Sequence, residues 1–217
     1  SFQSVIKLLK RGILKGYTFI ENGISENLFL PNKAITREEL VKLATGIRCI
    51  NCTNLHENIK KEIDNIYNKN KFPDTNISSN LNYCTAYGKN ENIISGYQGL
   101  EHQGYFLPKN NISRAEAIKI ILKASNTKII SNNDSNLPWF YHYILTAKRY
   151  DLYPENIFKE LDEYDFEQFE TWFDEQLISN GEFIKWIEGP MSRGEFAIMV
   201  SKTLSNIFDC ENTDSDK

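Results

Sequence analysis

The segment "NNISRAEAIKI" (residues 110–120) decides the fold, because it combines a helix-start signal with the beginning of an apolar stripe. Ser113 and Glu116 are three residues apart, which is the spacing of a capping box: each side chain accepts a hydrogen bond from a backbone N–H at the helix start. The apolar residues that follow recur at helical spacing and form one stripe: Ala117, Ile120, Ile121 and Ala124. The segment therefore predicts a helix that begins at Arg114 and buries one face.

Two other segments carry the same signal in the same phase. "AITREELVKL" (residues 34–43) contains Thr36 and Glu39, and "PMSRGEFAIM" (residues 190–199) contains Ser192 and Glu195. Their stripes are Leu40, Leu43, Ala44 and Ile47 in the first, and Phe196, Met199 and Val200 with the polar Thr203 in the last. The first helical position is an arginine each time: Arg37, Arg114 and Arg193, which are 77 and 79 residues apart. This recurrence predicts an internal repeat of three units, each with one capped helix.

The segments ahead of the first two capped helices repeat as well. "GILKGY" (12–17) matches "NIISGY" (92–97), and "LFLPN" (28–32) matches "YFLPK" (105–109), where the proline favours an extended approach to the cap. Each unit is therefore expected to contain a first helix, a polar loop and the capped helix. We expect the first helices within residues 4–17, where glycines stop the helix, at about 80–91, and within 134–154.

The three units account for most of the chain. We place them at residues 1–50, 72–126 and 127–208, with a helical insertion at 51–71 that includes "HENIKKEIDNIYNKN" and a tail at 209–217. The third unit is enlarged by a segment of about residues 155–188, which contains eleven acidic residues, two lysines and eight aromatic residues. This segment is too aromatic to be disordered and predicts one or two extra helices. The tail has the composition of a frayed end or linker.

The overall composition excludes two classes of protein. The 217 residues are 41% apolar and 25% charged, as in an ordinary globular protein. The formal net charge of −4 argues against a general nucleic-acid binder, which normally carries a basic face. No apolar run is long enough to span a bilayer. The chain opens like the middle of a helix and without a secretory leader pattern, so we expect a fragment of a longer protein.

The four cysteines are Cys49, Cys52, Cys84 and Cys210. "CINC" with His56 nearby suggests a zinc site, but the second ligand pair that such a site needs is absent, and we expect no metal. A disulfide between Cys84 and either Cys49 or Cys52 is the better interpretation, because these residues lie at predicted helix edges around one segment between units. Four unpaired thiols are the remaining alternative.

The order of these motifs resembles the S-layer homology (SLH) family, present as three tandem repeats. The resemblance rests on Gly-Tyr after the first helix, on Phe-x-Pro, and on Ile-(Thr/Ser)-Arg-x-Glu at the capped helix; it is specific in the second unit and degenerate in the third. It implies a mainly α fold, in which three helix-loop-helix repeats form one pseudo-threefold unit around a central helical bundle. It also implies a non-enzymatic, extracellular module without cofactors. Such a module anchors a bacterial surface protein to the cell wall without a covalent bond. It binds a secondary cell-wall polysaccharide, often pyruvylated, in clefts between the repeats. Other surface-layer proteins are its possible further partners.

The resemblance also implies which residues contact the ligand. The family arginine corresponds to Arg37, Arg114 and Arg193, the Gly-Tyr step supplies Tyr17 and Tyr97, and the family aromatic of the first helix corresponds best to Trp139. The Phe-x-Asp opening of a repeat is present at residues 72–74. An arginine fork at a positively polarised helix start suits a sugar carboxylate, and aromatic rings suit the apolar face of a sugar. This interpretation predicts that Arg114→Ala weakens glycan binding and leaves thermal stability nearly unchanged.

Other interpretations stay open. The arginines could pair with acidic residues of a neighbouring unit and serve packing, and the tyrosines and Trp139 could be core residues. The third unit lacks Gly-Tyr and carries the acidic insertion, which places its cleft in doubt. Gly194, where the family has alanine, slightly weakens the start of its capped helix. The chain could be an assembly module that makes protein contacts without glycan, or a glycosidase with paired carboxylates from "ELDEYDFEQFE" (160–170). His56, His102 and His142 fit no catalytic triad or metal spacing.

Overall fold

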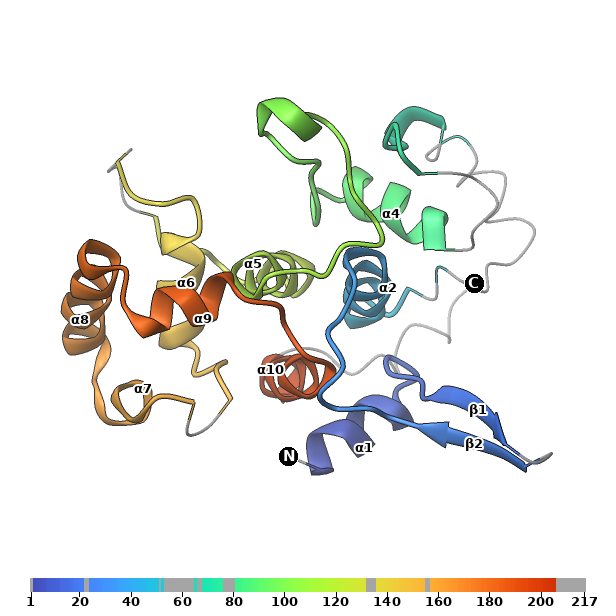
Figure 1. Ribbon diagram of the computed structural model, residues 1–217, viewed down its shortest axis with the longest axis horizontal. Helices are drawn as coiled ribbons and strands as arrows, with labels where there is room; N and C mark the ends of the chain where they lie inside the picture. The colour runs from blue at the N-terminus through green and yellow to red at the C-terminus, as the bar shows by residue number, and fades with distance from the viewer. Residues whose placement is uncertain are drawn as a thin grey trace, which may run out of the picture.

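The computed structural model describes residues 2–21, 24–50, 52, 65, 68–75, 81–131, 136–154 and 157–205. This part of the chain is mainly helical (Figure 1), as the sequence predicts. Its elements are α1 (Phe2–Lys10), β1 (Tyr17–Glu21), β2 (Ile24–Leu28), α2 (Arg37–Ile47), α4 (Leu81–Asn90), η1 (Leu100–His102), α5 (Arg114–Ala124), α6 (Tyr141–Arg149), α7 (Lys159–Glu163), α8 (Phe166–Ser179), α9 (Glu182–Glu188) and α10 (Arg193–Ser205). Most of "HENIKKEIDNIYNKN" and the whole predicted tail lie outside the described residues.

The three predicted capped helices are confirmed as α2, α5 and α10. Complete capping boxes start α2 at Thr36 and α5 at Ser113. At the start of α10, the Ser192 backbone N–H donates to Glu195 at 2.8 Å, and the Glu195 backbone N–H donates to the Ser192 hydroxyl at 3.3 Å. All three apolar stripes are buried, including the polar member Thr203. Local signals therefore position these helices as expected.

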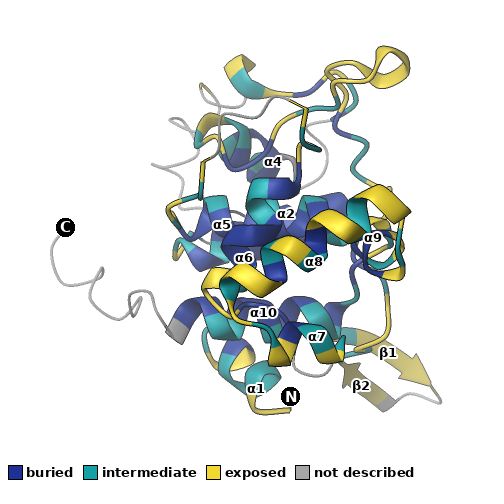
Figure 2. Cartoon of the chain, turned by 90° about the vertical axis from the view of Figure 1, so that its left-hand side faces the viewer, coloured by how far each residue is buried: buried dark blue, intermediate teal, exposed yellow. Residues whose placement is uncertain are grey.

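The segments just ahead of the three helices form a closed ring of backbone hydrogen bonds. Ile112 N donates to Ile35 O (3.0 Å), Met191 N donates to Ile112 O (2.9 Å), and Ile35 N donates to Met191 O (3.0 Å). These residues precede the three caps at equivalent positions. In Figure 1 the helices α2, α5 and α10 lie together in the middle of the molecule, with the other elements around them. Figure 2 shows buried residues concentrated in this central layer, and many exposed residues on α8 and on the strands.

The first helix of each unit packs on the capped helix of a different unit. Helix α1 lies against α10, α4 against α2, and α6 against α5. The units are thus interlocked, and a cut between any two of them would separate helices that share a core. The predicted units are therefore successive segments of the sequence, and each shares its core with another unit.

Two predictions about secondary structure are wrong. The polar loop expected after Tyr17 contains an antiparallel pair of strands, in which β1 pairs with β2 in the register Tyr17↔Leu28 to Glu21↔Ile24. Aromatic and β-branched residues in β1 favour the strand conformation. The enlarged segment of the third unit contains three helices, α7, α8 and α9, instead of one or two. Helix α8 begins at its own capping box, Asp165 with Gln168, and its buried Phe169 and Phe173 pack against Phe183 of α9.

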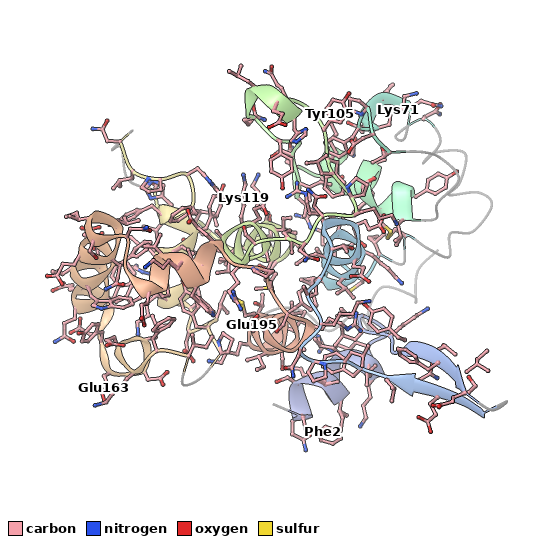
Figure 3. The ribbon with its side chains drawn as sticks, in the orientation of Figure 1. Phe2, Lys71, Tyr105, Lys119, Glu163 and Glu195 are labelled. Atoms are coloured by element: carbon pink, nitrogen blue, oxygen red, sulfur yellow. A yellow bond between two sulfur atoms is a disulfide. The ribbon has the colours of Figure 1, made fainter. Side chains whose placement is uncertain are left out.

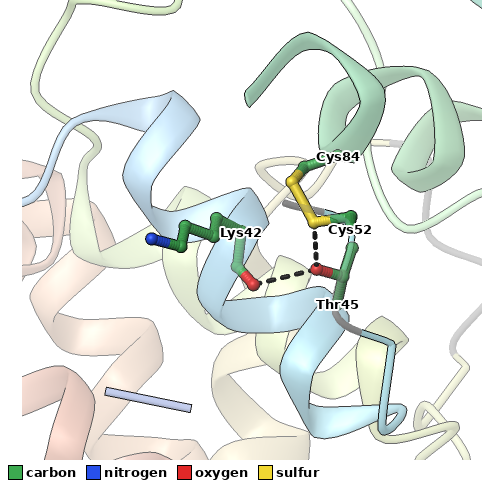
Figure 4. The surroundings of a disulfide bond; sticks show 4 residues. All are labelled: Lys42, Thr45, Cys52 and Cys84. Carbon is green, nitrogen blue, oxygen red and sulfur yellow. Dashed lines mark hydrogen bonds between the residues drawn. A yellow bond between two sulfur atoms is a disulfide. The ribbon is translucent and has the colours of Figure 1, made fainter. Parts of the chain in front are cut away.

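A disulfide joins Cys52 to Cys84 with a Cα–Cα distance of 5.2 Å (Figure 4), one of the two pairings that the sequence left open. The Thr45 hydroxyl of α2 lies 3.1 Å from the Cys52 sulfur, so the bond links the end of α2 to α4. No described cysteine is a free thiol, which rules out the alternative of four unpaired cysteines for this part of the chain. Among the described helices, none is long and apolar enough to cross a membrane.

Candidate functional site

Arg37 is the first residue of α2 and is buried against residues of the second unit. Its Nε donates to the Phe106 carbonyl at 2.7 Å and its Nη1 to Glu116 at 2.6 Å. The guanidinium carbon lies 4.4 Å from the ring centroid of Tyr97 and 4.9 Å from that of Phe106. With 5% of its side chain exposed, Arg37 is held by neighbouring protein groups.

Arg114 and Arg193 occupy corresponding places. Arg114 donates from Nε to Glu195 at 2.8 Å and from Nη1 to the Trp186 carbonyl at 2.9 Å, and its side chain is 16% exposed. Figure 3 shows Glu195 at the centre of the molecule, where α5 and α10 adjoin. Arg193 donates to the carbonyls of Phe29 and Lys15, at 2.9 and 2.8 Å.

The third arginine reaches its carboxylate through a tyrosine. Arg193 Nη1 donates to the Tyr17 hydroxyl at 3.3 Å, and that hydroxyl donates to Glu39 at 2.8 Å. Burial alone would raise the pKa of Glu39, but hydrogen bonds from the Thr36 backbone and Tyr17, with the nearby charges of Lys33 and Arg193, bring that pKa below its ordinary value. Glu39 is therefore held as a carboxylate at neutral pH.

The three arginines do not face outward to a ligand, as the resemblance led us to expect. Each points from one helix start to the capping glutamate of another unit, so the pairs Arg37–Glu116, Arg114–Glu195 and the relay Arg193–Tyr17–Glu39 close a ring. The reason is geometric: with helix starts hydrogen-bonded in a ring, the first helical residue of one helix faces the capping box of the next. The three guanidinium groups thus agree with the alternative interpretation, in which the arginines pair with a neighbouring unit and serve packing.

A pocket of about 410 Å³ lies where the second unit contacts the first and third. The segment after α4 contributes Gly96 and Tyr97, α5 contributes Glu116 and Lys119, and Arg37 and Trp139 come from the other two units. In Figure 3 Lys119 lies on the side of α5 that faces the segment carrying Tyr105. The structure thus brings Arg37, Tyr97 and Trp139 together, three of the six residues predicted to contact a ligand.

Aromatic and charged side chains both line this pocket. Trp139 is 52% exposed at its rim. Lys119 Nζ lies 5.2 Å from the Trp139 ring centroid and 5.6 Å from that of Tyr143. Burial lowers the pKa of Lys119 and raises that of Tyr97. The pocket therefore offers an exposed indole, a half-buried tyrosine and a lysine within a small space.

Two contacts fix the segment that forms the pocket wall. A Cβ added at Gly96 would lie 2.8 Å from the backbone of Gly104, so the two backbones meet where no side chain fits. Asp74 accepts from the backbone N–H groups of Phe106 and Leu107, at 2.9 and 2.7 Å, and Leu107 adopts a positive φ of 54°. The Phe-x-Asp opening thus anchors the chain between the pocket wall and α5.

The other predicted ligand residues lie elsewhere. Tyr17 contacts Arg193 and has Lys33 Nζ 3.7 Å from its ring centroid. Arg114 lies 4.7 Å from the Trp186 ring centroid. Sequence reasoning missed Lys119, although a signal exists: Lys42 and Lys119 each stand five residues after the helix-start arginine.

The chain was compared with protein-family models, with curated proteins and with solved structures, and none of them matches it.

Proposed function

We propose that this chain is a non-covalent cell-wall anchoring module of a bacterial surface protein, built from three SLH-like repeats in a pseudo-threefold arrangement. The ring of backbone hydrogen bonds at residues 35, 112 and 191, and the recurrence of capped helices, support the repeat arrangement. Its ligand is an anionic secondary cell-wall polysaccharide, and its further partners are other surface-layer proteins.

The observation that carries this proposal is the pocket between Tyr97 and Trp139. Its volume of about 410 Å³ falls in the range of small-molecule sites, roughly 300–1,000 Å³. Indole and phenol rings combine an apolar face with a polar edge, which suits the mixed surface of a sugar ring. A half-exposed tryptophan at the rim can cover the apolar face of a sugar whose hydroxyls reach the polar edge of the pocket.

The equivalent positions in the first and third units are less suited to binding a saccharide. Tyr17 already has two cations against its ring and gives its hydroxyl proton to Glu39. In the third unit Trp186 lies against Arg114 and no Gly-Tyr step is present. We therefore assign the polysaccharide to the second unit's pocket, and the three arginines to holding the repeats in register.

An extracellular location agrees with the disulfide between Cys52 and Cys84. Disulfides persist in oxidising environments such as the cell surface and are rare in reducing ones.

The proposal is tested with cell-wall polysaccharide purified from a Gram-positive bacterium, by isothermal titration calorimetry. Trp139→Ala should weaken binding about tenfold, or ~1.4 kcal/mol, without changing the far-UV circular dichroism spectrum. Phe19→Ala is the matched control, because Phe19 is a similarly exposed aromatic residue, 46% exposed, on β1. Unchanged affinity in Trp139→Ala, or equal losses in both variants, would contradict the assignment of the pocket.

A second candidate function is an assembly module, favoured by the charge distribution. Residues 155–188 hold eleven acidic residues and two lysines, whereas residues 1–50 hold eight basic and four acidic residues. Opposite charges on these two segments favour head-to-tail contact between copies. Sedimentation at low and high salt tests this: reversible association at low salt without glycan supports it, and a monomer throughout argues against it.

A further inference from the structure

We propose that Lys119, and none of the helix-start arginines, recognises the negative charge of the saccharide in this pocket. The ammonium group binds a carboxylate or phosphate carried by a sugar whose ring lies on Trp139. This inference rests on the proposed function and adds to it the residue that selects a charged ligand.

The first step is that the arginine of the pocket is already occupied. Two nitrogens of Arg37 donate to Phe106 and Glu116, and its side chain is 5% exposed. Aromatic rings of Tyr97 and Phe106 lie within 5 Å of the guanidinium carbon. A ligand anion that took the proton of Nε, or the Nη1 proton held by Glu116, would displace contacts that hold two units together.

The second step is that Lys119 is the cation of this pocket with its donors available. Within the described part of the chain, its Nζ makes no hydrogen bond and no ion pair, and its contacts are the rings of Trp139 and Tyr143. The nearest carboxylate, Glu116, is used by other groups: one oxygen accepts from Arg37 and the other from the Ser113 backbone and hydroxyl. Glu116 therefore acts on Lys119 as a nearby charge, without a hydrogen bond or ion pair to its ammonium group.

The third step is that the charged form of Lys119 is disfavoured where it lies. Burial disfavours its charged form and so lowers its pKa, and the charges of Lys123 and Arg37 act in the same direction, whereas Glu116 opposes them. A half-buried ammonium without an anionic partner is less stable than one that has such a partner. An anion bound beside Trp139 would supply the missing partner, so the charge of the ligand adds directly to its affinity.

The position of Lys119 in the repeat gives a matched comparison. Lys42 occupies the equivalent place on α2, where Lys15, Glu39 and Arg193 are its charged neighbours. The third helix has Ile198 at this place. Lys42→Met therefore removes the same charge from the same helical position without touching the pocket.

The experiment measures binding of three small probes by NMR titration: methyl glucoside, methyl glucuronide and glucose 6-phosphate. Wild-type protein should bind the two charged probes roughly fivefold more tightly than the neutral one, the scale of a partly exposed ion pair. Lys119→Met should lose this preference and keep the affinity for methyl glucoside. Lys119→Arg and Lys42→Met should keep the preference. A preference for one charged probe identifies the anion as carboxylate or phosphate.

The outcomes separate this inference from the proposed function. If Lys119→Met still prefers charged probes, or if Lys42→Met loses the preference equally, Lys119 does not select the charge, while saccharide binding stands. If wild-type protein binds neither these probes nor the wall polysaccharide, the proposed function itself fails and this inference with it.

Discussion

Arg37 and Glu116 are 79 residues apart in the sequence, yet Nη1 of the arginine lies 2.6 Å from Oε1 of the glutamate. Glu116 also closes the capping box of α5 with Ser113. One carboxylate thus starts a helix and fixes it against the neighbouring helix α2. Glu195 does the same for α10 and Arg114. The residues that give the repeat its sequence signature are also those that join the units.

This arrangement predicts that the arginines stabilise the fold. Arg37→Met leaves Glu116 without its buried partner and should lower the free energy of unfolding by about 3 kcal/mol, the scale of a broken buried ion pair. Arg114→Met should cost less, because Arg114 is more exposed, at 16% against 5%. Urea denaturation followed by circular dichroism measures both. The ligand interpretation of these arginines predicts the opposite result, normal stability with weakened glycan binding.

Glu39 predicts a specific dependence of stability on pH. Its pKa in the folded protein lies below the ordinary value of 4.5, so its ionised form favours the folded state above that pH. This contribution should be lost as the pH falls below 4.5 through the folded-state pKa. Between pH 7 and pH 3, the unfolding free energy of Glu39→Gln should therefore fall less steeply than that of the wild type. Parallel pH profiles for the two proteins would refute this role.

The disulfide predicts a loss of stability on its removal. Cys52 and Cys84 close a loop with a sequence separation of 32, and such a cross-link contributes roughly 3–4 kcal/mol, mainly by restricting the unfolded chain. The double variant Cys52→Ser, Cys84→Ser should be destabilised by about this amount in urea. At a temperature where this double variant stays folded, its saccharide binding should be unchanged, because neither cysteine lines the pocket.

Gly96 and Gly99 form a matched pair for testing the pocket wall. A Cβ at Gly96 would lie 2.8 Å from the Gly104 backbone, whereas nothing lies within 4 Å of a Cβ at Gly99. Gly96→Ala should displace the Tyr97 segment and weaken polysaccharide binding at least tenfold, or ~1.4 kcal/mol. Gly99 also lines the pocket, but Gly99→Ala adds a methyl group to open space and should bind more tightly than Gly96→Ala. Equal affinity of the two variants, measured by calorimetry, would show that the wall position does not matter.

The capped helices could be predicted because their signals are local. Ser113 and Glu116 specify a helix start within four residues, and the stripes after each cap reproduce the buried faces of α2, α5 and α10. The strands β1 and β2 could have been predicted too, because Asn-Gly at residues 22–23 is a common hairpin signal. The expectation of a polar loop left this signal out.

The site depended on contacts that no short window of sequence contains. The position of Arg37 against Glu116 follows from the ring of helix starts, which only the folded chain displays. Trp139 and Tyr97 were identified through a family resemblance, whereas Lys119 becomes visible only once Glu116 is seen to be occupied by Arg37 and Ser113. Spacing could suggest which residues repeat, but it could not tell which of them keep free donors.

The most direct test of the central claim is an NMR titration of isotope-labelled protein with purified cell-wall polysaccharide. The account predicts saturable chemical-shift changes that centre on the Trp139 indole N–H and the backbone of Tyr97 and Lys119, with little change at Tyr17 or Trp186. Changes centred on α7–α9 or on the β1–β2 strands, with Trp139 unaffected, would contradict it.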